Sequence, residues 1–157
     1  MRRRHISVSG IFNFVAISDR IATAGQPTQE QFEAARDDGY QVVVNLLPNT
    51  QGNALKDEDR IIRSLGLEYQ YIPVVWTNPR REDFDTFCDT MKNLGDKKVL
   101  IHCAMNLRVT AFFSSYAMKD LGWSRADADA LMARVWDIEP KYKDNATWRA
   151  FIQSIRP

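Results

Sequence analysis

The chain of 157 residues has little of several features that mark whole classes of protein. It has only two cysteines, so it is not a disulfide-stapled scaffold, and a reactive or buried thiol is the expected use of each. Its 21 basic and 20 acidic side chains leave a formal charge of +1, which argues against a nucleic-acid partner and against an acidic disordered tail. No apolar run approaches the roughly 20 residues that span a membrane. Repeats and Pro/Gly/Ser-rich linkers are absent too, so we predict a single domain over residues 1–157.

The N-terminus carries three arginines, Arg2 to Arg4, before the apolar stretch 11–17, an arrangement that resembles a signal peptide. Asn13 interrupts this stretch, however, and the polar segment 18–20 closes it early. We therefore predict a basic N-terminal arm over 1–17 rather than a cleaved signal. The corresponding prediction for localisation is the cytoplasm, or the periplasm if the N-terminus has been processed.

Strand-like and helix-like patterns alternate through the middle of the chain. Runs rich in β-branched and apolar residues predict buried strands, and they lie at 21–23, 42–47, 69–75 and 99–101. Apolar residues at helical spacing, with capping residues and terminal glycines, predict helices that begin near Thr28, Ala54, Arg81 and Val109. Ser124 and Asn145 open further helices. This alternation predicts an α/β fold with a central, mostly parallel sheet of four to five strands flanked by helices: a core over 18–121 and C-terminal helices over 122–157.

The strongest candidate for chemistry follows the predicted strand at 99–101, where His102-Cys103 precedes Arg108 at the start of a helix. Loop N–H groups and helix N-termini at the carboxyl ends of parallel strands attract anions. The same field favours a thiolate at Cys103, and Arg108 can hold an oxyanion with two hydrogen bonds. The alternative is a small buried cysteine and a surface arginine. Cys88 lies on an apolar helix face, and we predict that it is a core residue.

His102-Cys103 and Arg108 after a hydrophobic strand resemble the signature loop of protein tyrosine and dual-specificity phosphatases. Three further segments are similar to successive landmarks of the small bacterial branch, the beta-lactamase-hydrolase-like phosphatase domains: 21–28, 42–46 and 71–74. The resemblance implies a dual-specificity-phosphatase-like fold. It also implies hydrolysis of phosphomonoesters through a cysteinyl-phosphate intermediate, without a metal or cofactor. The partner would be a phosphorylated small molecule or a phosphoprotein.

The resemblance also implies roles for individual residues. Cys103 is the nucleophile, Arg108 is the phosphate clamp, and His102 orients the loop and tunes the thiolate. The backbone amides that complete the phosphate cradle are those of Ala104, Met105, Asn106, Leu107 and Arg108. Trp76 follows the strand whose end faces the site, which makes it the candidate wall of the substrate pocket.

The loop departs from the phosphatase pattern in length and composition. Four residues separate Cys103 from Arg108 where phosphatases usually have five, and none of the four is glycine, so we predict a left-handed Asn106. Thr110 keeps the usual spacing of the hydroxyl that bonds the phosphatase thiolate, and that register would put Val109 in the place of the arginine. We predict instead that Arg108 turns into the loop. A four-residue gap is also familiar from rhodanese-like sulfurtransferases, so sulfur transfer through a Cys103 persulfide is an alternative.

The general acid is a second departure. Phosphatases usually place an Asp shortly after the strand that here ends at Val75, but residues 76–78 include no carboxylate. Asp83 is our candidate, with Asp85 second, although acidic residues in the first turn of a helix also complement the helix dipole. A missing acid would favour slow turnover or substrates with good leaving groups. It also leaves open a module that binds phosphorylated or other oxyanionic ligands without catalysis.

Overall fold

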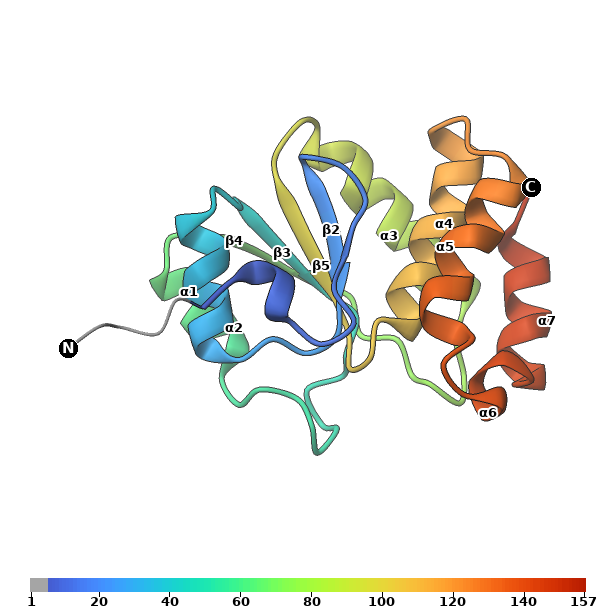
Figure 1. The fold of residues 1–157 in the computed structure, drawn as a ribbon, viewed down its shortest axis with the longest axis horizontal. Helices are drawn as coiled ribbons and strands as arrows, with labels where there is room; N and C mark the ends of the chain where they lie inside the picture. Colours follow the sequence, from blue (N-terminus) through green and yellow to red (C-terminus); the bar gives the residue numbers. More distant parts are fainter. Residues whose placement is uncertain (1–5) are drawn as a thin grey trace.

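The structure is a computed structural model and describes residues 6–157, so the basic segment Arg2–Arg4 lies outside the described residues. The predicted N-terminal arm covers 1–17. From Ile6 onward, this segment contains a 3₁₀ turn, η1 (Val8–Gly10), and a short strand, β1 (Val15–Ala16). Val8 and Ile11 are buried, so this part of the chain packs against the rest of the fold (Figure 1).

The centre of the molecule is a five-stranded sheet in the order β1-β2-β5-β3-β4. The remaining strands are β2 (Ile21–Ala24), β3 (Val42–Asn45), β4 (Glu68–Tyr71) and β5 (Val99–His102). β1 pairs antiparallel with β2, and the other three pairings are parallel. The predicted α/β class and mostly parallel sheet are therefore confirmed.

Seven α-helices connect and follow the strands within residues 6–157: α1 (Gln29–Asp37), α2 (Glu58–Ser64), α3 (Arg81–Leu94), α4 (Leu107–Asp120), α5 (Arg125–Trp136), α6 (Pro140–Lys143) and α7 (Ala146–Ile155). The predicted capping box of α1 is present, since Thr28 and Gln31 bond each other's backbone N–H groups. α2 begins four residues later than the predicted start at Ala54, after a loop rich in turns. β4 ends at Tyr71, before Pro73, because proline has no N–H to donate to a sheet.

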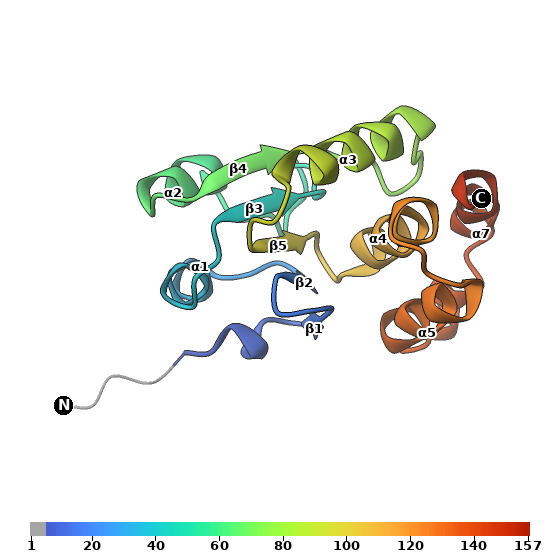
Figure 2. The ribbon, with the colours of Figure 1, turned by 90° about the horizontal axis from the view of Figure 1, so that it is seen from above.

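Alternate strand residues face two separate layers of helices. Val42 and Val44 belong to a core with residues of α3, α4, α5 and α7, whereas Val43 belongs to a core with residues of α1 and α2. Figure 1 shows α1 and α2 on one side of the sheet and α3 and α4 on the other, and Figure 2 shows the same arrangement from above. Helices thus cover both faces of the sheet, which leaves the ends of the strands as the place for a site. In the described part of the chain, we find no helix that could span a membrane.

Candidate active site

The candidate catalytic loop joins β5, the central strand, to α4. β5 lies between β2 and β3, and His102 is in register with Ala24 on one side and Asn45 on the other. Residues 103–108, here called the Cys103 loop, therefore emerge at the carboxyl ends of three parallel strands. Open α/β sheets bind their ligands at this edge.

Asn106 turns the short loop into α4. Its φ is 69°, so the predicted left-handed conformation is confirmed. Its side-chain amide donates to the Thr23 hydroxyl and to the Asn13 carbonyl oxygen, each at 2.9 Å. These bonds hold the turn against β2 and against the segment before β1. The Cys103 loop therefore needs no glycine, since a tethered asparagine takes the strained position.

Gly25, directly after β2, allows the chain to approach the Cys103 loop closely. Gly25 and Met105 form an isolated antiparallel bridge, and the Gln26 N–H donates to the Ala104 carbonyl oxygen at 2.9 Å. A Cβ atom at Gly25 would lie 2.6 Å from that same oxygen, so only glycine fits here. The segment after β2 is thus a fixed wall of the loop.

The carbonyl groups of the Cys103 loop are held by partners on its outer side. The Cys103 oxygen faces His102 Nδ1 at 3.1 Å, the Ala104 oxygen accepts from the Gln26 N–H at 2.9 Å, and the Asn106 oxygen accepts from the Thr110 N–H at 3.1 Å. In a trans peptide the C=O and N–H groups point in opposite directions. The N–H groups that follow, those of Ala104, Met105 and Leu107, therefore point away from these partners. Together with the first N–H groups of α4, which have no acceptor within the helix, they form a donor set suited to an anion.

Arg108 lies in the first turn of α4 and is almost fully buried, with 4% of its surface exposed. Burial lowers the pKa of its guanidinium below the ordinary arginine value, and the charge of Cys103 and a hydrogen bond with it oppose this shift. Nη2 donates to Gln51 Oε1 at 2.7 Å, whereas the buried Nε has no partner within the described residues. The Arg108 guanidinium is therefore near enough to Cys103 for their charges to interact, and within the described residues its Nε remains a free donor.

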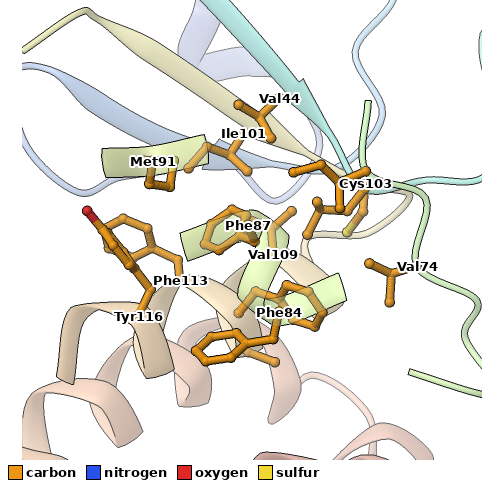
Figure 3. Packing of buried hydrophobic residues seen from close by; sticks show 14 of the residues in the cluster. Val44, Val74, Phe84, Phe87, Met91, Ile101, Cys103, Val109, Phe113 and Tyr116 are labelled. Carbon is orange, nitrogen blue, oxygen red and sulfur yellow. The ribbon is translucent and has the colours of Figure 1, made fainter. Parts of the chain in front are cut away.

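The two cysteines occupy different environments. Cys103 is fully buried at the end of β5, and it belongs to the same apolar cluster as Val74 and Val109 (Figure 3). Cys88 lies on the buried face of α3 and belongs to the core, as predicted. Burial raises the pKa of its thiol to about 11. Cys103 interacts with the buried guanidinium of Arg108, so it is the thiol with a chemical environment suited to reaction.

The Thr110 side chain has hydrogen-bond partners other than the thiol. Its hydroxyl donates to the Asn106 carbonyl oxygen at 2.8 Å and accepts from Trp136 Nε1 at 3.1 Å. Val109 packs fully buried among apolar side chains. In this register the arginine lies at the Cys103 loop, and the hydroxyl of Thr110 is taken up by α4 and Trp136.

The Asp83 carboxylate is paired with a neighbouring arginine. Its carboxylate pairs with Arg80 at 3.0 Å and accepts from the Arg80 backbone N–H at 3.3 Å, so it caps α3. Asp85 is exposed and lies 4.0 Å from Arg81. Neither contact involves a residue of the Cys103 loop.

Trp76 connects the loop to the C-terminal helices. Its indole stacks on Trp148 with ring centroids 5.1 Å apart and on Trp136 at 5.8 Å. The Arg108 guanidinium lies over the Trp76 ring, 5.4 Å from its centroid. Trp76 thus lies beside the arginine, on the side of the site where we expected a pocket wall.

A buried carboxylate behind the loop was missed by the sequence analysis. Glu58, the first residue of α2, has Oε2 2.7 Å from His102 Nε2. The same carboxylate accepts from the Tyr69 hydroxyl at 3.1 Å and from Gln26 Nε2 at 2.8 Å. Burial and the Glu58 charge raise the pKa of Tyr69. Glu58 stands 44 residues before His102 in a charge-rich stretch, and nothing in the local sequence distinguishes it from a surface acid.

Comparisons with known proteins agree with this geometry. No family model matches the chain. The beta-lactamase hydrolase-like proteins of Xylella fastidiosa strains Temecula1 and 9a5c are 29% identical to it over 122 residues, which is 74% of this chain. The chain spans 28% of the length of these curated relatives.

Solved structures identify the fold more clearly than the sequence relatives do. A DUF442 protein of Shewanella putrefaciens CN-32, named as a candidate phosphatase, superposes with a TM-score of 0.85 at 29% identity, covering 94% of this chain and 91% of that one. TpbA of P. aeruginosa, solved in complex with pTyr, superposes with a TM-score of 0.69 at 13% identity, covering 98% and 92%. The chain has a protein-tyrosine-phosphatase-like fold. The resemblance to tyrosine and dual-specificity phosphatases is therefore confirmed.

The phosphatase-like fold brings a thiol, a guanidinium and a row of backbone N–H groups together at one strand end. Within residues 6–157, His, Cys, Asp and Glu side chains do not gather in a group of three that could hold a metal ion. This set of groups can supply a nucleophile and stabilise the negative charge of a tetrahedral oxyanion.

Proposed function

We propose that the chain is a cysteine-dependent phosphatase that hydrolyses phosphomonoesters through a cysteinyl-phosphate at Cys103. The observation that supports this most strongly is the burial of Arg108 near Cys103, with an Nε that has no partner among residues 6–157. An unpaired buried donor costs about 1–3 kcal/mol. A phosphate oxygen would accept a hydrogen bond from this Nε, and the planar guanidinium of arginine matches the geometry of phosphate better than any other side chain.

The reaction has two steps. The Cys103 thiolate attacks phosphorus, an S–P bond forms, and the ester oxygen leaves with the electron pair of the broken P–O bond. Water then attacks phosphorus, the S–P bond breaks, and inorganic phosphate and the thiolate are released. The loop N–H groups and Arg108 hold the non-bridging oxygens in both steps, where charge develops.

Gln51 occupies part of this site. Its side-chain oxygen accepts the hydrogen bond from Arg108 Nη2, and the Cys103 side chain is fully covered. A phosphate that reaches Cys103 must therefore take the place of the Gln51 oxygen on the guanidinium. Since Gln51 is itself exposed in the loop between β3 and α2, this exchange needs no change in the core.

The position of Asp83 indicates which leaving groups the site favours. Its carboxylate is paired with Arg80 and caps α3, so we propose that it acts as a cap rather than as the general acid. Esters whose oxygen leaves without protonation, such as aryl phosphates, are then the favoured substrates. The half-buried Trp76 beside Arg108 offers an aromatic wall for such a group, in a phosphorylated small molecule or a phosphoprotein.

A second candidate function is the binding of phosphorylated ligands without turnover. The fully buried thiol and the occupied Asp83 both favour it.

One experiment separates the two functions. Wild type and Cys103→Ser are incubated with p-nitrophenyl phosphate in the presence of a chelator, and vanadate binding is measured in parallel. We expect turnover by wild type and none by the variant. Turnover that survives the substitution, or that requires added metal, contradicts the phosphatase mechanism. Vanadate binding that depends on Arg108, without turnover of any aryl phosphate, supports the binding module.

A further inference from the structure

The buried ring of His102 has a hydrogen-bond acceptor on each side. Nε2 lies 2.7 Å from Glu58 Oε2, and Nδ1 lies 3.1 Å from the Cys103 carbonyl oxygen. A carbonyl oxygen can only accept, so Nδ1 must carry a hydrogen. The ring packs against Phe32 in an edge-type arrangement and the His102 side chain is fully buried, so both of its nitrogens have protein partners inside the fold.

Two donors besides His102 indicate that the Glu58 carboxylate is ionised. Asn45 Nδ2 donates to the Tyr69 hydroxyl oxygen at 2.9 Å, which directs the hydroxyl hydrogen to Glu58. Gln26 Nε2 donates to the other carboxylate oxygen. A carboxyl group that receives hydrogen bonds on both oxygens is favoured in its charged form. The remaining proton between Glu58 and His102 then belongs to Nε2, and the ring carries two N–H groups.

We propose that Glu58 is a positioning residue that holds His102 as an imidazolium directly behind Cys103. This inference rests on the proposed function only in that the Cys103 thiolate is the nucleophile. The charged ring would favour the thiolate, because charges interact strongly in a buried site. Its Nδ1–H would also fix the Cys103 carbonyl, which turns the Ala104 N–H toward the anion. The Arg108 guanidinium also interacts with the charge of Cys103, so the imidazolium would act together with a second cation near the thiol.

The charge of the His102 ring can be measured directly by NMR. The chain has two histidines, so a His5→Ala variant labelled with ¹⁵N-histidine reports on His102 alone. At pH about 7.5, we expect two N–H signals from the ring, the mark of an imidazolium. A ring with a single N–H in this otherwise native protein would overturn the proposal, whatever the variants below do.

Two variants of the network separate charge from packing. Glu58→Gln keeps the shape but removes the charge, and an imidazolium without its partner is unfavourable in a buried site, so we expect the neutral ring. Tyr69→Phe removes one hydrogen bond to Glu58 and keeps the charge, so we expect the ring to stay doubly protonated. Equal spectra for wild type and Glu58→Gln would contradict the role of Glu58.

The thiolate supplies a second measurement that does not depend on catalysis. Its ultraviolet absorbance is followed against pH in a Cys88→Ser background, with Cys88→Ser/Cys103→Ser as the blank. We expect Glu58→Gln to lower the thiolate fraction near neutral pH by about tenfold, and Tyr69→Phe to change it much less. Equal effects of the two variants would show that the network acts only through packing. If the thiolate behaves as expected but no aryl phosphate is hydrolysed, the proposed function fails and the role of Glu58 stands.

Discussion

Replacing Arg108 by lysine keeps the positive charge at the Cys103 loop but removes the planar fork. In the structure this side chain interacts electrostatically with Cys103 and donates to Gln51, and its buried Nε has no partner in the described part of the chain. Hydrogen bonds from a charged group are worth about 1.5–3 kcal/mol each, and a lysine ammonium would replace one of the two that the fork makes to phosphate. The shorter reach of lysine weakens the one that remains. We therefore expect a loss of about 2–4 kcal/mol in transition-state stabilisation, which is roughly a 30- to 1000-fold drop in kcat/KM.

The assay is hydrolysis of p-nitrophenyl phosphate, with the Kd of vanadate as a second readout. Arg134→Lys, on an exposed position of α5, is the matched control, and we expect it to stay within about twofold of wild type. Arg80→Ala, at the start of α3, should have only a mild effect. The reasoning is refuted if Arg108→Lys loses less than about threefold in kcat/KM, or if the control loses as much. Diffuse positive charge, rather than the fork of one arginine, would then account for the activity.

Three further predictions follow from individual contacts. Gln51→Ala frees the Arg108 guanidinium, so vanadate should bind about two- to tenfold more tightly by calorimetry; weaker binding would show that Gln51 helps to hold the anion. Gly25→Ala places a Cβ 2.6 Å from the Ala104 oxygen and should cost about 1–3 kcal/mol of stability and most of the activity. Gly10→Ala, with open space around it, should cost much less in the same denaturant titration. Because burial raises the pKa of Cys88 from its ordinary 9.0 to about 11, the unfolded chain loses this proton first, so stability falls as pH rises between these values. Cys88→Ala should therefore reduce the loss of unfolding free energy between these pH values by up to about 2–3 kcal/mol. An unchanged pH slope of the unfolding free energy would contradict the raised pKa of Cys88.

The parts of the fold that the sequence predicts well depend on local interactions. β-Branched runs predict β3 and β5 because strands buried on both faces must be apolar throughout. Thr28 and Gln31 predict the start of α1 because a capping box is complete within four residues. Asn106 belongs to the same group, since a short loop without glycine leaves few residue types for a left-handed position.

The parts of the site that the sequence does not predict depend on contacts between distant segments. Glu58 and Gln51 come from the stretch between β3 and β4, where charge and turn residues suggest only a solvated surface. Thr110 has the spacing of a catalytic hydroxyl, but its hydroxyl accepts from Trp136, which lies 26 residues further along the chain. Asp83 is an exception, since its partner Arg80 lies only three residues before it, and its position in the first turn of α3 already allowed a role at the helix start. Periodicity carries no information on such partners.

The covalent intermediate is the most direct test of the central claim. The enzyme is mixed with p-nitrophenyl phosphate, quenched in acid during turnover, digested and examined by mass spectrometry. The account predicts one phosphoryl group on the peptide that contains Cys103 and none on the peptide with Cys88. It also predicts that Asp83→Asn leaves the amount of this intermediate largely unchanged, because the proposed role of Asp83 is to cap α3. Sustained hydrolysis without a phosphorylated Cys103, or hydrolysis by Cys103→Ser, would contradict the account.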